Sequence, residues 1–143
     1  MSGLVSNYKI LKEQNLIVEY HFGILDADSF IAFKKSITLD ALFLPSMHYF
    51  VHLKNVTFST NLEDIDKYVN FLDANSKVFG NRRVALITNT PNQVVSTTIF
   101  KMMQQNKSQS VEVFSTNESA LEWLNSNLNK NEILAILAEL IQA

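Results

Sequence analysis

Apolar residues recur along the chain at the spacings of strands and helices, and these spacings predict its secondary structure. Residues 8–22 (YKILKEQNLIVEYHF) are predicted to form two strands that meet at Gln14 and Asn15. Asparagine tolerates the positive φ of a tight hairpin, and the apolar positions suit a sheet with one buried face. We therefore expect an antiparallel hairpin at the start of the chain.

A helix is predicted directly after this hairpin. Asp26 or Asp28 can serve as its N-cap, because a short carboxylate accepts hydrogen bonds from the first amides of a helix. Phe30, Phe33 and Ile37 follow at helical spacing and form one apolar stripe.

The middle of the chain predicts another strand and a second helix. Residues 47–56 (MHYFVHLKNV) follow Pro45 and are rich in aromatic and branched side chains, as strands are. Asn61 can cap the next helix, and acidic residues in its first turn favour the helix dipole. The apolar stripe of this helix consists of Leu62, Ile65, Val69 and Leu72.

The second half of the chain continues the alternation of strands and helices. Residues 82–89 (RRVALITN) contain a short continuous apolar run, which is typical of a central strand buried on both faces. Pro91 suits the first turn of the next helix, which is predicted to extend to about Asn106. The inner face of that helix is expected to consist of Val95, Ile99, Met102 and Met103.

The last elements are a strand and two helices. The strand Val111–Phe114 leads into a helix predicted to run through Leu128, with Ser115 and Glu118 at capping-box spacing. A final helix is predicted over residues 131–142, with an apolar face of Ile133, Leu134, Ile136, Leu137, Leu140 and Ile141. We expect this face to pack over the sheet. The alternative is that it docks a second copy of the chain and forms a homodimer.

The order β-β-α-β-α-β-α-β-α-α predicts an α/β fold. Its mixed β-sheet would begin with an N-terminal antiparallel hairpin and continue with β-α units, and an extra C-terminal helix would follow. A chain of 143 residues fits one domain, and no repeat, low-complexity tract or linker divides it. We expect a single domain over residues 1–143 with its core at about residues 8–128.

Composition excludes several classes of function. The net charge of −2 and the presence of only two arginines, Arg82 and Arg83, argue against binding to nucleic acid or anionic membranes. The chain has no cysteine and three scattered glycines, which excludes thiol chemistry and phosphate-binding loops. No apolar stretch approaches the ~18 residues of a membrane span, and no signal peptide is recognised. A cytoplasmic protein with no cofactor is therefore expected.

The last strand and the helix after it carry a resemblance to a known family. Val-Phe at the end of the strand, followed by Ala-Leu and Trp-Leu in the helix, is similar to the pattern of STAS domains, the sulfate-transporter and anti-sigma-factor-antagonist fold. The positions are Val113, Phe114, Ala120, Leu121, Trp123 and Leu124. The likeness covers about residues 8–128 and is greatest to stand-alone bacterial STAS-like proteins. Its motifs are mostly hydrophobic positions, so they specify the fold more than the activity.

The resemblance implies a site at the start of the helix after the third strand. Family members carry a serine there that a partner kinase phosphorylates, and the corresponding residue here is Asn61. Ser59 and Thr60 lie close by but out of register, and the glycine and adjacent serine of the family are missing. The sequence therefore departs from the phosphorylation pattern, whereas a protein-binding surface at the same helix start remains expected.

Three connections between strands and helices should meet at the carboxyl edge of the sheet, where open α/β sheets bind their ligands. They contain NVTFSTN, TNTPNQ and FSTN, all rich in hydroxyls and amides. The plainer interpretation is that these residues cap helices, since caps select the same residue types. The partner surface predicted at this edge consists of Ser59, Thr60, Asn61, Glu63, Asp64, Thr90 and Asn92.

No catalytic or metal site is predicted. His48 and His52 are four residues apart, but in a strand this places them about 13 Å apart, too far to share an ion, and His21 lies on another strand. The acidic residues near Asn61 suit a helix start. Arg82 and Arg83 lie at the amino end of the central strand, on opposite faces, where surface solubility is the expected role.

The sequence thus favours a non-enzymatic STAS-like regulatory or interaction module whose protein partner is unknown. The alternative is a carrier of a small apolar or lipid-like ligand, because the ten Phe and four Met residues are sufficient to line a cavity. The same residues also suffice for a packed core. An enzyme is the third interpretation, for which no nucleophile–base pair is found.

Overall fold

The computed structural model describes residues 3–59, 61–105 and 107–143. Its strands are β1 (Val5–Leu11), β2 (Leu16–Leu25), β3 (His48–Phe58), β4 (Arg82–Ile87) and β5 (Gln109–Phe114). Its helices are α1 (Ala27–Thr38), α2 (Leu62–Ala74), α3 (Ser76–Phe79), α4 (Pro91–Met103), α5 (Asn117–Trp123) and α6 (Lys130–Gln142). The predicted element order is confirmed, with the short helix α3 as an addition.

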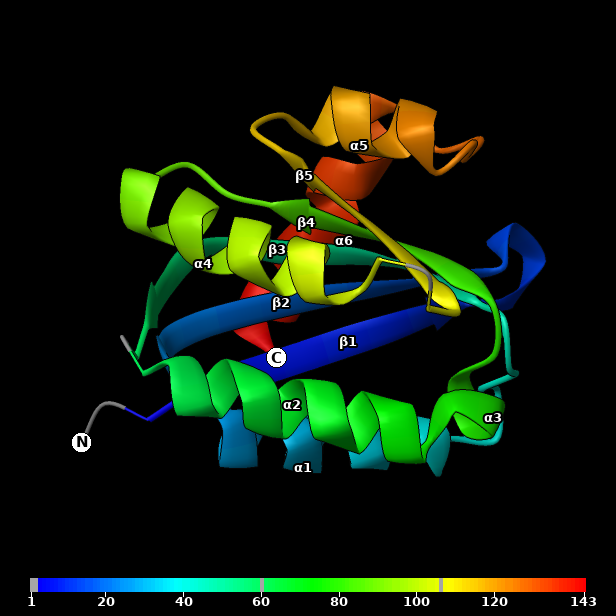
Figure 1. The fold of residues 1–143 in the computed structure, drawn as a ribbon. Coiled ribbons are helices and arrows are strands. Elements are labelled where there is room, and N and C mark those ends of the chain that lie inside the picture. The colour runs from blue at the N-terminus through cyan, green and yellow to red at the C-terminus, as the bar shows by residue number, and fades with distance from the viewer. Residues whose placement is uncertain (1–2, 60, 106) are drawn as a thin grey trace.

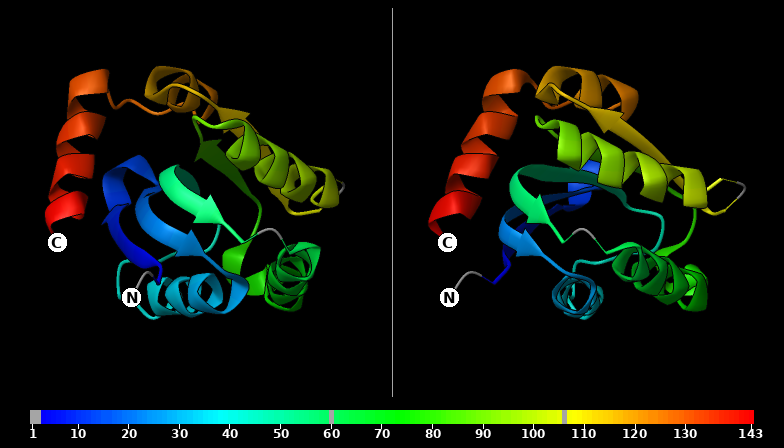
Figure 2. Two further views of the ribbon diagram at one scale, coloured as in Figure 1. Left: turned by 90° about the vertical axis from the view of Figure 1, so that its left-hand side faces the viewer. Right: turned by 60° about the vertical axis from the view of Figure 1, so that its left-hand side comes forward.

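The five strands form one sheet in the order β1-β2-β3-β4-β5. β1 pairs antiparallel with β2, and every other neighbouring pair is parallel. Helices α1 to α4 lie on one face of the sheet, and α5 and α6 lie on the other (Figures 1 and 2). The predicted mixed sheet with an N-terminal hairpin and an extra C-terminal helix is therefore confirmed.

The hairpin turns through a 3-10 helix, Lys12–Gln14, followed by Asn15. Asn15 has a φ of 53°, so the expected positive φ is confirmed at this residue. The first helix begins as predicted, because Asp26 accepts a hydrogen bond from the amide of Ser29 and is the N-cap of α1.

The inner face predicted for α4 is wrong. Val95 and Met102 are 58% and 63% exposed, whereas Gln93 and Thr97 are buried. The side chain of Gln93 donates to the carbonyls of β3, and Thr97 donates to a carbonyl of its own helix. Polar groups that are hydrogen-bonded can be buried at little cost. A prediction based only on the positions of apolar residues therefore selected the wrong face of this helix.

The boundaries of α5 also differ from the prediction. Thr116, not Ser115, is the N-cap, because its hydroxyl accepts a hydrogen bond from the amide of Ser119. This helix ends at Trp123 rather than Leu128, and Asn125 then takes a left-handed φ of 56°. A single residue in this conformation is enough to turn the chain out of a helix.

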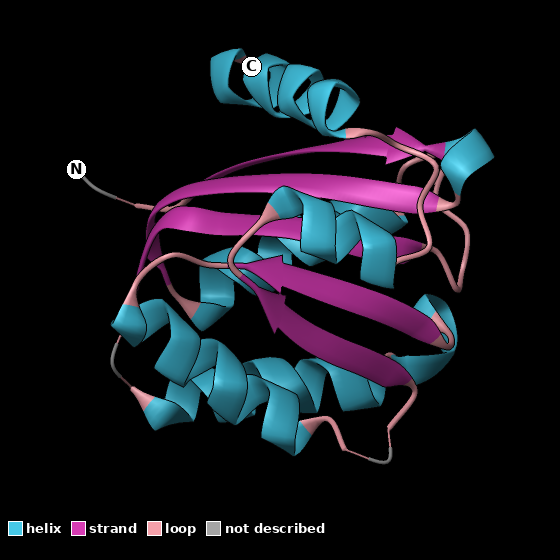
Figure 3. Ribbon diagram, turned by 90° about the horizontal axis from the view of Figure 1, so that it is seen from above, coloured by secondary structure: helices cyan, strands magenta, loops and turns pink. Residues whose placement is uncertain are grey.

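The final helix covers the second face of the sheet. Ile133, Leu137 and Leu140 are buried, and α6 packs on β1 and β2. Figure 3 shows α6 along one side of the strands, away from α1, α2 and α4. The predicted packing of this helix over the sheet is confirmed. Leu134 and Ile141 form the part of its apolar face that stays exposed.

Helix α2 lies among the other helices of its face of the sheet. It packs mainly on α1, α3 and α4 rather than directly on a strand. Val69 and Leu72 of its predicted stripe are buried, but Leu62 at its start is 61% exposed. The N-cap is Asn61, as predicted, since its side chain accepts a hydrogen bond from the amide of Glu63. Space therefore remains between α2 and the sheet.

Candidate functional site

An open groove of about 620 Å³ lies at the carboxyl end of β3, between the starts of α2 and α4. Of the predicted partner surface, Ser59, Asn61, Thr90 and Asn92 line this groove. Two of the three predicted connections therefore meet, as expected from the rule that ligand sites form at the carboxyl edge of parallel strands.

The remaining predicted residues are arranged differently. Asp64, Glu63 and the third connection, FSTN, do not line the groove. Asp64 instead lines a second cavity, beneath α2. Thr60 lies outside the described residues. The predicted surface is therefore brought together only in part.

Two of the predicted polar groups serve as helix caps. Asn61 caps α2, and Thr90 forms a capping box with Gln93 at the start of α4. The hydroxyl of Ser59 donates to Asp64 at 2.5 Å and so ties the end of β3 to the first turn of α2. The interpretation as caps is thus confirmed for Asn61 and Thr90, and both residues also line the groove.

Apolar side chains complete the groove. Leu62 of α2 and Val95 of α4 are both more than half exposed there, and Ile65 and Ile99 extend the same surface. An apolar surface rimmed by amides and hydroxyls is typical of a protein-binding site. Charged groups are few, so contact with a partner here would depend on shape and apolar burial.

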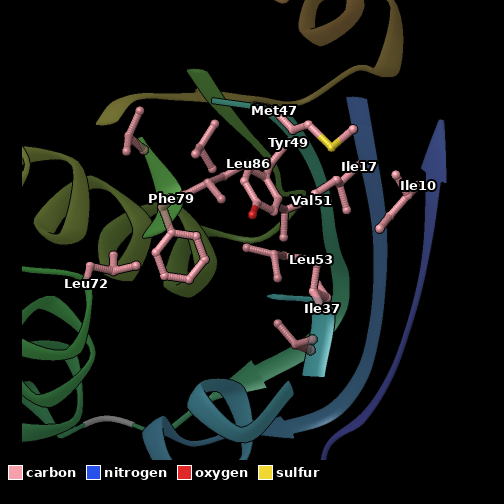
Figure 4. Close-up of a cluster of buried hydrophobic side chains, with 13 residues drawn as sticks. Ile10, Ile17, Ile37, Met47, Tyr49, Val51, Leu53, Leu72, Phe79 and Leu86 are labelled. Carbon is pink, nitrogen blue, oxygen red and sulfur yellow. The ribbon is translucent and has the colours of Figure 1, made fainter. Parts of the chain in front are cut away.

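A second, more enclosed cavity lies beneath α2, between this helix and the sheet. It measures about 80 Å³. Its walls are mostly aromatic and aliphatic, and most of them come from α1, α2, α3, α4 and the strands β3 and β4. They include Phe30, Val51, Leu53, Phe58, Tyr68, Leu72, Phe79, Leu86 and Phe100. Figure 4 shows the side chains of the core on this face of the sheet, including Val51, Leu53 and Phe79.

Three ionisable side chains form a buried network beside this cavity. Glu19 of β2 accepts hydrogen bonds from Lys34 of α1 and from Nε2 of His21, the latter at 2.8 Å. The hydroxyl of Ser6 lies 2.7 Å from Nδ1 of His21. All three ionisable groups are almost fully buried. A carboxylate with two donors is the arrangement that makes a buried charge tolerable.

The charges of this network follow from its contacts. Burial alone would raise the pKa of Glu19, but the charge of Lys34 and the hydrogen bond of His21 outweigh it and lower that pKa. Burial lowers the pKa of His21, so this imidazole is neutral near pH 7. Burial also lowers the pKa of Lys34, and the charge of Glu19 opposes that shift. Glu19 and Lys34 therefore form an ion pair whose two charges cancel.

Arg82 overturns the prediction of a solvent-exposed arginine. Its residue is only 6% exposed, and its guanidinium donates to the carbonyl of Gly80 at 2.8 Å and to the side chain of Gln109 at 2.7 Å. Arg83, by contrast, is exposed on the other face and donates to the carbonyl of Trp123. The alternation of the two arginines was predicted correctly, but the inward position lies at the cavity.

The histidines do not form a cluster. His48 accepts a hydrogen bond from the amide of Arg83, and His52 stacks on Tyr20 with 5.4 Å between ring centroids. Across residues 3–59, 61–105 and 107–143, no three His, Asp or Glu side chains gather as a metal ion would require. No helix in this part of the chain is long and apolar enough to cross a membrane.

Sequence reasoning missed the cavity and the buried charges around it. One signal was present: Glu19 interrupts the apolar strand LIVEYHF at a position flanked by Val18 and Tyr20. A carboxylate in the middle of a buried strand requires a partner. That partner, Lys34, lies on the next helix, and its position depends on how α1 crosses the sheet.

Comparison with known proteins supports the fold. No family model matches the chain, and no curated protein matches it either. A solved structure, that of an uncharacterised protein of the DUF3478 family with a SpoIIAA-like fold from Shewanella loihica PV-4, is similar to it with a TM-score of 0.57. The two sequences are 16% identical, and the likeness covers 87% of this chain and 95% of that chain. The chain therefore has a SpoIIAA-like, STAS-like fold.

Proposed function

We propose that this protein is a non-enzymatic, STAS-like interaction module that binds a protein partner in the groove between α2 and α4. The observation that carries the proposal is the convergence of Ser59, Asn61, Thr90 and Asn92 around exposed Leu62 and Val95. Side chains of this kind give hydrogen bonds at the rim and apolar contact at the centre of an interface.

The local chemistry agrees with binding rather than with bond making. The hydroxyl of Ser59 donates to the carboxylate of Asp64, and that of Thr90 accepts from the amide of Gln93, so neither is paired with a histidine or a lysine. Among the described residues that line the groove there is no histidine and one lysine, Lys54 of β3. A nucleophile needs an adjacent base or a strongly shifted pKa to react.

The test is an affinity capture from lysate of the protein's own host with three versions of the chain. Asn61→Arg places a long cation at the rim of the groove, and we expect it to lose the partners that the wild type retains. Asn70→Arg is the matched control, because Asn70 is exposed on the same helix but lies outside the groove. Identical partner lists from wild type and Asn61→Arg would contradict the proposal.

A second candidate function, a carrier of a small apolar ligand, is favoured by the cavity beneath α2. Its walls are largely apolar, and α2 packs on other helices rather than on the strands below it. Ligand sites are generally concave and apolar with a few polar groups that fix orientation. The cavity meets that description.

A further inference from the structure

The polar groups of the cavity beneath α2 are unusual for a packed core. Lys34, Tyr49 and Arg82 all lie on its wall, and all three are buried. Lys34 is paired with Glu19 and lies 4.1 Å above the centre of the Tyr49 ring. Arg82 is therefore the buried cation on this wall that is left to account for.

Arg82 has no counter-ion in the described part of the chain. Its contacts there are the carbonyl of Gly80, the amide oxygen of Gln109 and the face of the Phe79 ring, 4.9 Å away. These partners are neutral, and a guanidinium has five N–H donors to satisfy. A buried cation without an ion-pair partner is costly to maintain, and the carboxylate of Asp64, which also lines the cavity, does not pair with Arg82 but accepts a hydrogen bond from Ser59.

Tyr49 supplies a second, independent observation. Its residue is 2% exposed, and its hydroxyl has no hydrogen-bond partner among the described residues. Figure 4 shows the hydroxyl oxygen directed toward Phe79, on the side of the sheet where the cavity lies. A buried hydroxyl without a partner is uncommon in native structures and indicates a missing one.

From these observations we infer that the cavity binds a small apolar carboxylic acid. The carboxylate accepts hydrogen bonds from the Tyr49 hydroxyl and the Arg82 guanidinium and serves as the counter-ion of Arg82. The hydrocarbon part lies against Val51, Leu53 and Leu86. This inference rests on the carrier function and adds the chemical class of the ligand.

The size of the ligand follows from the cavity. About 80 Å³ is roughly half the volume of an engineered apolar cavity that binds benzene. Because the benzene-binding cavity holds six carbons, this space takes only about three heavy atoms, as many as the carboxylate group itself has. The hydrocarbon chain of an acid would require α2 to move away from the sheet.

The ligand has a route from the groove. Phe58, Ser59, Ile65 and Ser96 line both the groove and the cavity, and all four are only half-buried. The charged and aromatic groups Lys34, Tyr49 and Arg82 lie at the buried end. An acid therefore enters carboxylate first from the groove, past the Ser59–Asp64 hydrogen bond.

Binding is tested by calorimetric titration of the full chain with straight-chain carboxylates from propanoate to octanoate, and with the 1-alcohols of equal length. We expect carboxylates to bind at least tenfold more tightly than the matched alcohols. Affinity should rise about fourfold for each methylene that becomes buried, from ~0.8 kcal/mol per buried CH₂. Equal affinities for acids and alcohols, or no saturable binding of either, would overturn the inference.

Three variants assign the binding to these groups. Tyr49→Phe removes one unpartnered oxygen, so the fold should be retained while carboxylate affinity falls about tenfold. Arg82→Gln should abolish the preference for acids over alcohols. Arg83→Gln, the adjacent exposed arginine, is the control and should bind like the wild type. Unchanged acid affinity in Tyr49→Phe and in folded Arg82→Gln contradicts the assignment.

Native mass spectrometry of protein purified from its own host separates this inference from the carrier function. A copurifying acid supports both. A neutral apolar ligand supports the carrier function and overturns the acid. A ligand-free mass together with no binding of acids or alcohols overturns both, and the cavity then holds water only.

Discussion

On the face of the sheet that α1 to α4 cover, single residues carry charges at positions where buried strands are usually apolar. Glu19 and Lys34 pair in the core, with His21 as the third member of their network. Outside the core, Lys9 and Glu139 form an exposed ion pair at 3.1 Å. The two pairs allow a comparison of the same interaction in two environments.

Replacement of Glu19 by glutamine should lower the free energy of unfolding by about 3–5 kcal/mol, because it leaves the Lys34 ammonium buried without a counter-ion. The double variant Glu19→Gln/Lys34→Met should lose less than the sum of the two single variants, since the uncompensated charge is gone. Urea unfolding monitored by circular dichroism measures all of these values.

The control for this prediction is Glu139→Gln. Its exposed pair with Lys9 is expected to contribute less than about 1 kcal/mol, because solvent screens the charges. Additive losses in the Glu19 and Lys34 variants, or equal losses in Glu19→Gln and Glu139→Gln, would show that the buried pair is not coupled as described.

At the scale of elements, polar contacts link α4 to β3 beside the groove. Gln93 is buried, and its side-chain nitrogen donates to the carbonyls of Lys54 and Val56 at 3.0 and 2.9 Å. Its side-chain oxygen accepts from the amides of Asn89 and Thr90. One side chain therefore links the end of β3, the β4–α4 turn and α4.

Gln93→Ala should destabilise the protein by at least 2–3 kcal/mol, because it leaves several buried backbone groups without partners. Gln105→Ala is the control, since Gln105 is exposed just after α4 and is expected to change the free energy of unfolding by less than about 0.5 kcal/mol. Chemical denaturation of the two variants provides the comparison. Similar stabilities would mean that Gln93 does not hold α4 on the sheet.

The prediction of these elements succeeded where local rules decide the outcome. Asp26, Asn61 and Pro91 began their helices as predicted, since caps depend on neighbouring residues. The face of α4 failed because Gln93 and Thr97 find partners in β3 and in their own helix, and these partners decide which side is buried. Hydrophobic periodicity contains no information about such partners.

At the scale of the whole molecule, burial in the folded state lowers the pKa values of the histidines and so disfavours their protonation. Burial lowers the pKa values of His21 and His48, and it lowers that of His52 to about 4. The unfolded chain takes up protons on these groups below about pH 6.5, whereas the folded chain does not. The free energy of unfolding should therefore fall as the pH is lowered from 6.5 toward 4.

The fall should be up to about 1.4 kcal/mol per pH unit for each group that titrates only in the unfolded chain. His52→Phe keeps the ring that stacks on Tyr20 but cannot be protonated, so its stability should change less with pH. Urea unfolding of wild type and variant from pH 7 to pH 4 measures both slopes. Parallel slopes would show that His52 is protonated equally in the folded and unfolded states.

The two parts of the candidate site, the groove and the cavity, differ in how far the sequence predicted them. The groove was predicted in part, because parallel strands bring their carboxyl ends together and place Ser59 and Asn61 near Thr90. The cavity was not, because Lys34 and Arg82 are 48 positions apart and line one cavity only in the folded chain. Sequence spacing does not report such an arrangement.

By itself, the sequence determined the order of strands and helices, the mixed sheet and the helix caps, because these follow from the spacing of apolar residues and from contacts within a few positions. The tertiary structure alone decided that Arg82 is buried without a counter-ion, that Glu19 pairs with Lys34, and that α2 leaves space above the sheet. Burial and charge pairing depend on distances between residues remote in the chain, and the packing of the helices sets those distances.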